Sequence, residues 1–148
     1  MGKINTGRVI VGGLLAGLVF NIGEIILNVF VVAKAWDEWG MKHQFNMTMG
    51  AGGYIMMFVI MFLLGIFAVW LYAAIRPRYS AGPRTALCAG LAVWLAASLY
   101  PALGMLTMSM YPFSLAIITL IWGLVEILLG TYLGAWYYRE QQAAAPAA

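Results

Sequence analysis

The sequence predicts an all-α fold, a four-helix transmembrane bundle formed by a single membrane domain over residues 1–148. Of the 148 residues, 64% are hydrophobic and only 9% are charged, whereas a soluble domain carries about a quarter charged residues. A helix needs about 20 apolar residues to cross a hydrocarbon core of ~30 Å. Such runs occur four times, at 9–33, 54–75, 85–108 and 113–136. The runs are continuous rather than alternating, which favours helices over barrel strands.

The first span follows two basic residues, Lys3 and Arg8. Its apolar run is too long for a secretory signal peptide and no small-x-small cleavage site closes it, so we expect an uncleaved first helix. An outer loop, 34–53, comes next. Its segment 36–49 mixes charged and aromatic residues. This composition is compatible with a short helix on the membrane surface or with an ordinary ordered loop.

The remaining connections are short. In the loop 76–84, Pro77 is predicted to end the second span, and the residues from Ser80 to Pro83 provide a turn and the start of the third. Only four residues, 109–112, link the third span to the fourth. Short links favour antiparallel neighbours and therefore an up-down-up-down bundle. The low-complexity tail, 141–148, is expected to be disordered.

The basic residues predict the orientation of the bundle. Two of them, Lys34 and Lys42, lie in the loop 34–53. The other six lie on the opposite side: Lys3, Arg8, Arg76, Arg78, Arg84 and Arg139. This bias places both termini and the loop 76–84 in the cytoplasm. We expect a multi-pass protein of the inner (plasma) membrane whose partner is the lipid bilayer, with self-association or another membrane protein left open. The sequence has no basic patch with interleaved aromatic residues outside the membrane, so we expect no nucleic-acid binding.

The first and fourth spans each carry a stripe of small and polar residues at helical spacing. Residues that follow one another in steps of three and four lie on the same face of a helix. The first stripe comprises Gly13, Gly17, Asn21, Glu24 and Asn28. The second comprises Thr119, Gly123, Glu126, Gly130, Gly134 and Tyr137. Small residues spaced by four let membrane helices approach closely, so we predict that the two spans meet along these stripes, in contact or around a narrow cleft.

Glu24 and Glu126 are acidic residues inside apolar runs. A charged side chain at this depth costs at least ~2.5 kcal/mol, so such residues usually have a partner or a function. A helix rises ~1.5 Å per residue, which places Glu24 roughly 24 Å and Glu126 about 15 Å from the cytoplasmic ends of their spans. The resulting depth difference of ~9 Å predicts a ladder of Asn21, Glu24 and Asn28 rather than a proton shared by the two acids.

Two functional hypotheses follow from these acids. In the first, each acid is protonated and donates one hydrogen bond across a helix pair, in a non-enzymatic packing or interaction module with a small intramembrane polar cleft. In the alternative, Glu24 and Glu126 serve a small proton- or cation-coupled transporter or channel subunit. Glutamine should be tolerated at both positions in the first case, and should abolish activity in the second.

Metal and cofactor motifs are weak in this sequence. Met47 and Met49, and Met108 and Met110, form two Met-x-Met words. Thioethers select Cu(I), but methionine is more often a flexible apolar filler, so we expect neither a metal nor a cofactor. A single histidine, His43, excludes bis-histidine haem and multi-histidine zinc sites. We find no Walker loop, nucleophile elbow or dinucleotide fingerprint and expect no enzymatic activity.

Several loose patterns extend over most of the chain. The first span is glycine-rich and is followed by Trp36, Trp39 and Gly40, the second span ends in an aromatic-rich turn, and the glycine-rich closing helix ends near Trp136. In these features the sequence resembles a bacterial family of four-helix integral membrane proteins of unknown function. The resemblance implies a fold and no activity.

Overall fold

The computed structural model describes residues 4–44, 49–110 and 112–138. This part of the chain is helical and contains no strand. Four helical spans are long and apolar enough to cross a membrane: Thr6–Val31, Ala51–Tyr79, Pro83–Thr107 and Phe113–Tyr137. The predicted all-α class with four spans is therefore confirmed. The tail 141–148, predicted to be disordered, lies outside the described residues.

Two of the spans contain a π-helical turn, one at the end of the first span and one within the third. The first span consists of α1 and the π-turn η1, and the third consists of α4, the π-turn η2 and α5. The elements in chain order are α1 Thr6–Ile26, η1 Leu27–Val31, α2 Ala33–His43, α3 Ala51–Tyr79, α4 Pro83–Trp94, η2 Leu95–Leu99, α5 Tyr100–Thr107 and α6 Phe113–Tyr137. We refer to the end of the bundle that carries α2 as the α2 end.

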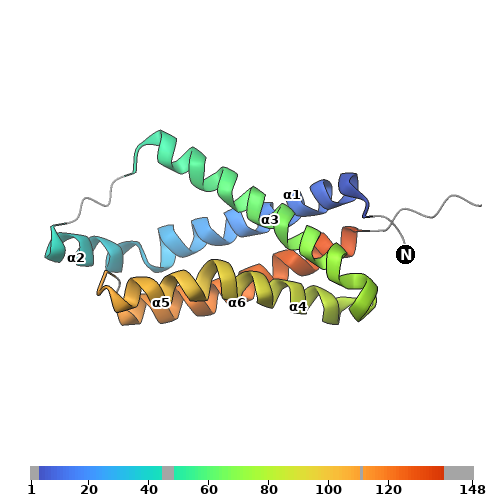
Figure 1. The fold of residues 1–148 in the computed structure, drawn as a ribbon. Helices are drawn as coiled ribbons and strands as arrows, with labels where there is room; N and C mark the ends of the chain where they lie inside the picture. The colour runs from blue at the N-terminus through green and yellow to red at the C-terminus, as the bar shows by residue number, and fades with distance from the viewer. Residues whose placement is uncertain (1–3, 45–48, 111, 139–148) are drawn as a thin grey trace, which may run out of the picture.

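Helix α1 packs against both α3 and α6, and α4 packs against α6 and α3. Gly12 lies against Gly134 and Gly23 lies against Glu126, so α1 and α6 run antiparallel. The buried core lies where these helices are closest, around residues such as Phe20, Val69 and Val93. Toward the α2 end, α3 diverges from the other helices (Figure 1). The bundle is therefore tightly packed in one half and open in the other.

Helices α1 and α3 approach closely through glycines. A Cβ atom added to Gly17 would lie 2.6 Å from the Cα of Phe62, and one added to Gly65 would meet the backbone of Gly13 and Gly17. The prediction that the Gly13–Gly17 face meets the fourth span is therefore wrong, because this face packs against α3. Helix α1 presents its neighbouring face, at Gly12, to α6. Helical spacing identifies which residues share a face, but it does not identify the helix that packs there.

The glycines of α6 divide between two neighbours. Gly130 lies against the Phe20 ring of α1, and Gly134 lies against the backbone of Gly12. The predicted contact between the first and fourth spans is thus present through these two glycines. Gly123 instead faces Ser98, whose Oγ would be 3.7 Å from an added Cβ.

Two connecting segments differ from a simple loop. Helix α3 continues through Pro77 and ends at Tyr79, so the prediction that Pro77 ends the second span is wrong. Proline removes one hydrogen bond to the preceding turn, but the helix ends only where Ser80 adopts a φ of 69°. Helix α4 then begins at Pro83 as predicted. The segment 36–49 was expected to be either a short helix or an ordered loop. Its first part is helical, because α2 extends to His43.

Candidate functional site

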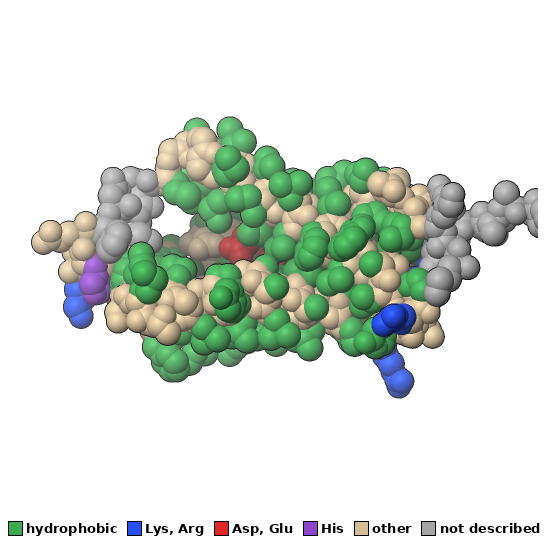
Figure 2. All heavy atoms as spheres, viewed as in Figure 1, with side chains coloured by type: hydrophobic (Ala, Val, Ile, Leu, Met, Phe, Trp, Pro, Cys, Tyr) green, Lys and Arg blue, Asp and Glu red, His purple; other side chains and the backbone are tan. Residues whose placement is uncertain are grey.

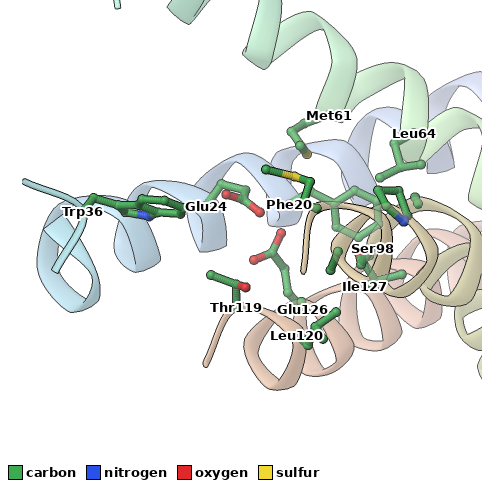
Figure 3. A pocket seen from close by; sticks show the side chains of 15 residues that line it. Phe20, Glu24, Trp36, Met61, Leu64, Ser98, Thr119, Leu120, Glu126 and Ile127 are labelled. Carbon is green, nitrogen blue, oxygen red and sulfur yellow. The ribbon is translucent and has the colours of Figure 1, made fainter. Parts of the chain in front are cut away.

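A cavity of about 290 Å³ lies in the open half of the bundle (Figure 3). Its walls come from α1, α3, the η2–α5 segment and α6, and Trp36 of α2 also lines it. Glu24 from α1 and Glu126 from α6 point into this cavity, and their carboxyl groups face each other (Figure 3). The cavity therefore brings together the two acids that the sequence identified on separate spans.

Glu24 is half-buried, and its carboxyl group accepts a hydrogen bond from a residue of the same span. The Nδ2 of Asn28, one turn further along the chain, donates to Glu24 Oε2 at 2.7 Å and to the Glu24 carbonyl at 2.9 Å. The predicted polar ladder is thus present between Asn28 and Glu24. Asn21 has another role: its Nδ2 donates to the Gly17 carbonyl at 2.8 Å and to the Phe58 carbonyl of α3 at 3.4 Å. This buried amide therefore joins α1 to α3.

Glu126 is the more buried acid, with 7% of its surface exposed. The indole Nε1 of Trp122, one turn earlier on α6, donates to Glu126 Oε2 at 3.0 Å. The same carboxyl group lies against Gly23, in the space that a side chain at that position would occupy. It also interacts electrostatically with Glu24. One oxygen of each carboxyl group is thus held by a donor from its own helix.

The depth difference of ~9 Å predicted from the span ends does not keep the two acids apart. The carboxyl group of Glu126 touches Gly23, the residue next to Glu24. The prediction assumed that the ends of the two spans were level. The glycine contact between Gly12 and Gly134 sets a different register, and the long glutamate side chain covers the remaining separation. The two carboxyl groups therefore lie in the same cavity, although they come from different spans.

No lysine, arginine or histidine is among the described residues that line the cavity. The one ion pair found between described side chains, Lys34 with Glu38 at 3.7 Å, lies on the exposed surface of α2. Two carboxylates at close range repel each other, and their low-dielectric surroundings strengthen this repulsion. The pair can thus hold two negative charges only when a cation lies nearby.

The η2 turn contributes Ala97 and Ser98 to the cavity wall. The backbone N–H of Tyr100 donates to the Leu95 carbonyl in the π register, and Pro101 has no N–H. The Ala96 carbonyl therefore lacks both of its usual helical donors. Turns of this kind occur frequently at functional sites.

The other candidate residues occupy different places. Thr119 and Gly123 line the cavity, and the Thr119 hydroxyl donates to the Leu115 carbonyl at 3.0 Å. Of the copper candidates, Met49 lines a groove between α1 and α3, whereas Met108 and Met110 belong to the turn after α5. Met49 thus lies on a different part of the bundle from Met108 and Met110. Met47 lies outside the described residues.

Two grooves border the cavity. One, of about 600 Å³, runs between α1 and α6. Its lining is almost entirely apolar and includes Glu126. The other, of about 250 Å³, lies between α1 and α3 and includes Glu24, Asn21 and Asn28. Each acid is therefore shared between the cavity and one groove.

No family model, no curated protein and no solved structure matches this chain. The resemblance to bacterial four-helix proteins of unknown function therefore stays a prediction. The fold and the site define a class: a multi-pass membrane protein with two carboxyl groups facing each other in a cavity between its helices.

Proposed function

We propose that the protein is a small proton- or cation-coupled transporter or channel subunit that exchanges protons for a cation at Glu24 and Glu126. One observation carries the proposal: the two carboxyl groups face each other in one cavity whose described lining has no basic residue (Figure 3). Two ionised carboxyl groups at close range would repel each other and weaken the packing of the bundle. A cation bound between them would compensate their charge.

The exchange of a proton for a cation follows from the repulsion between the carboxylates of Glu24 and Glu126. Without a cation, a proton on one carboxyl group removes the repulsion between them. When a cation binds, it compensates the negative charge and the proton can leave. The Asn28 and Trp122 donors hold one oxygen of each carboxyl group, which leaves the other oxygen of each group for a proton or a cation. Proton release and cation binding are thus alternatives at the same site, which is the requirement for coupling.

A second candidate function is the non-enzymatic packing or interaction module. The glycine contacts between α1, α3 and α6 favour it, as do the hydrogen bonds that already occupy each acid. In this case the acids stabilise the bundle and bind nothing. Glutamine can replace such an acid as a hydrogen-bonding group but cannot release its proton, so Gln variants separate the two functions.

The test uses the full chain in liposomes that contain the pH-sensitive dye pyranine. Sodium, potassium or benzyltrimethylammonium chloride is added outside at equal internal and external pH. Exchange of an incoming cation for an outgoing proton should make the interior more alkaline. Glu24→Gln and Glu126→Gln should each abolish this signal while retaining the melting temperature of the parent in detergent.

Glu38→Gln is the matched control, because Glu38 lies on α2 with 63% of its side chain exposed and outside the cavity lining. It should exchange protons at the rate of the parent. Equal exchange by the parent and the two cavity variants would overturn the proposal, as would the absence of exchange with all three cations.

A further inference from the structure

The cavity opens on the long side of the bundle. Figure 2 shows a hollow between the upper and lower helices, with an acidic side chain visible inside it. Met61 and Leu64 of α3 form one side of the cavity, and Pro101 and Met105 of α5 form the other. Helix α3 diverges from α5 at this level (Figure 1). Since the long side of a membrane bundle faces the hydrocarbon, this opening leads to the lipid.

At the α2 end, the cavity is bordered by an aromatic side chain. Trp36 of α2 lines the cavity and packs against a buried cluster of Leu27, Val32 and Leu115. Figure 3 shows its indole ring beyond Glu24, at the end of the cavity. In the described part of the chain, this packing separates the acids from that end of the bundle. The lateral opening between α3 and α5 is thus a more direct route to the carboxyl groups than the α2 end of the bundle.

The lining is mostly apolar. Besides the two carboxyl groups, the described side chains that line it offer only the hydroxyls of Ser98 and Thr119 as oxygen ligands, and the Thr119 hydroxyl is hydrogen-bonded to the backbone. A hard inorganic cation prefers a dense shell of oxygen ligands, about six to eight for calcium. The cavity is also many times larger than the ~30 Å³ that one water occupies in the liquid. Its chemistry fits an organic body better than a dehydrated metal ion.

We infer that the cation exchanged at Glu24 and Glu126 is a small amphipathic organic ammonium ion that reaches the cavity from the bilayer between α3 and α5. This inference rests on the proposed function and names its substrate class. The charged nitrogen lies between the carboxyl groups, where one acid O–H bond breaks and its proton leaves to water along the groove between α1 and α3 that Glu24 also lines. The apolar body contacts the remaining lining, and the partly exposed Trp36 ring provides an aromatic surface for a cation.

Binding is measured with radiolabelled benzyltrimethylammonium and the full chain in phosphatidylcholine nanodiscs. This probe has a permanent charge, so it cannot exchange its own proton. We expect saturable binding, release of one proton per bound cation, and a loss of affinity of at least about tenfold in Glu24→Gln and in Glu126→Gln. Glu38→Gln should bind as the parent does. Neopentylbenzene, the uncharged carbon analogue of the probe, should compete at least about tenfold more weakly.

The route is tested separately. Met105→Trp places a bulky ring at the opening, and we expect slower association of the probe. Met108→Trp, on an exposed residue outside the cavity lining, should associate at the rate of the parent. Equal association rates in Met105→Trp and the parent would overturn the lateral route.

The outcomes also separate the inference from the proposed function. If sodium or potassium drives proton exchange but benzyltrimethylammonium does not bind, the substrate class is wrong and the proposed function stands. If no cation drives exchange and the probe does not bind, both are wrong. If the probe binds equally well to the parent and to both Gln variants, the carboxyl pair is not its site and the inference is overturned.

Discussion

The carboxyl group of Glu126 occupies the space where a side chain on Gly23 would lie. A Cβ atom added to Gly23 would be 2.8 Å from the Cγ of Glu126 and closer still to its carboxyl group. The absence of a side chain at position 23 therefore lets Glu126 extend past the backbone of α1 toward Glu24. The contact differs from the other glycine contacts of α1, where the neighbouring atoms belong largely to the backbone.

Gly23→Ala should consequently change function more than stability. The added methyl group displaces the Glu126 carboxyl group, which is the end of a flexible side chain, and weakens its hydrogen bond from Trp122. We expect slower cation-driven proton exchange in pyranine-loaded liposomes and a melting temperature near that of the parent. Gly104→Ala is the control, because an added Cβ there meets nothing within 4 Å. Exchange at the parental rate in Gly23→Ala would show that this position of the carboxyl group is not required.

Gly17→Leu and Gly130→Leu should destabilise the bundle. At Gly17 an added Cβ lies 2.6 Å from the Cα of Phe62, and at Gly130 it lies 3.1 Å from the Ala16 carbonyl oxygen. Backbone atoms cannot rotate away, so the helices must separate. Overpacking of this kind costs about 1–3 kcal/mol or more. Thermal melts in detergent measure the loss, with Gly104→Leu as the control.

Unchanged melting of both variants would show that these glycines are not packing contacts. Destabilisation of Gly130→Leu alone would assign the important contact to α1 and α6 rather than to α1 and α3. The comparison therefore tests the two glycine contacts one at a time.

The apolar runs were sufficient to predict the four spans, because the membrane imposes both length and composition. The glycines of both stripes face other helices. The stripes could not show that Gly13 packs against α3 while its neighbour Gly12 packs against α6, because spacing defines a face and not its partner. The helix end at Pro77 was wrong for a local reason, since the φ that ends α3 belongs to Ser80.

The site was predicted in part. Both acids were evident as ionisable residues in apolar runs, and Asn28 follows Glu24 at hydrogen-bonding distance on a helix. Their meeting in one cavity depends on the register of α1 against α6, which the span ends do not determine. Trp36 and Ser98 carried no signal in the sequence, because tryptophan at the end of a span and serine within one have many ordinary roles.

Orientation in the membrane stays a prediction that reporter fusions can test. The excess of basic residues at the α3–α4 turn and near both termini places these segments in the cytoplasm. Fusions after Ala148 and at Ala81, in the turn between α3 and α4, should both report a cytoplasmic location. A fusion after Gln44, at the end of α2, should report the opposite side. A cytoplasmic signal from the Gln44 fusion would contradict this orientation.

Cation affinity should depend on pH in one direction. Protons and the cation compete for the same carboxyl groups, so lowering the pH should weaken binding of benzyltrimethylammonium. Where one proton leaves for each cation bound, the apparent affinity should fall by roughly tenfold per pH unit. Equilibrium binding in nanodiscs between pH 5 and 8 measures this slope. An affinity independent of pH in this interval would contradict exchange with a single proton.

Infrared spectroscopy can observe the carboxyl groups themselves. The described lining of the cavity contains no basic side chain to hold them charged, so before the probe is added we expect the band of protonated acids at pH 7. Glu24→Gln and Glu126→Gln assign this band by its loss. Addition of benzyltrimethylammonium should then convert part of it into a carboxylate band, because one O–H bond breaks when the cation binds. The same addition to Glu126→Gln should give a smaller change.

Neopentylbenzene serves as the control, since it has the shape of the probe but no charge and should leave the acid band unchanged. A carboxylate band assigned to Glu24 or Glu126 that persists at pH 5 before any probe is added would contradict the neutral-acid state. Such a band would require a positive charge already beside the pair, and the described lining contains no side chain that supplies one. It would therefore indicate a tightly bound cation or a hydrated path to the acids. In either case the exchange would begin from an ionised pair rather than from a protonated one.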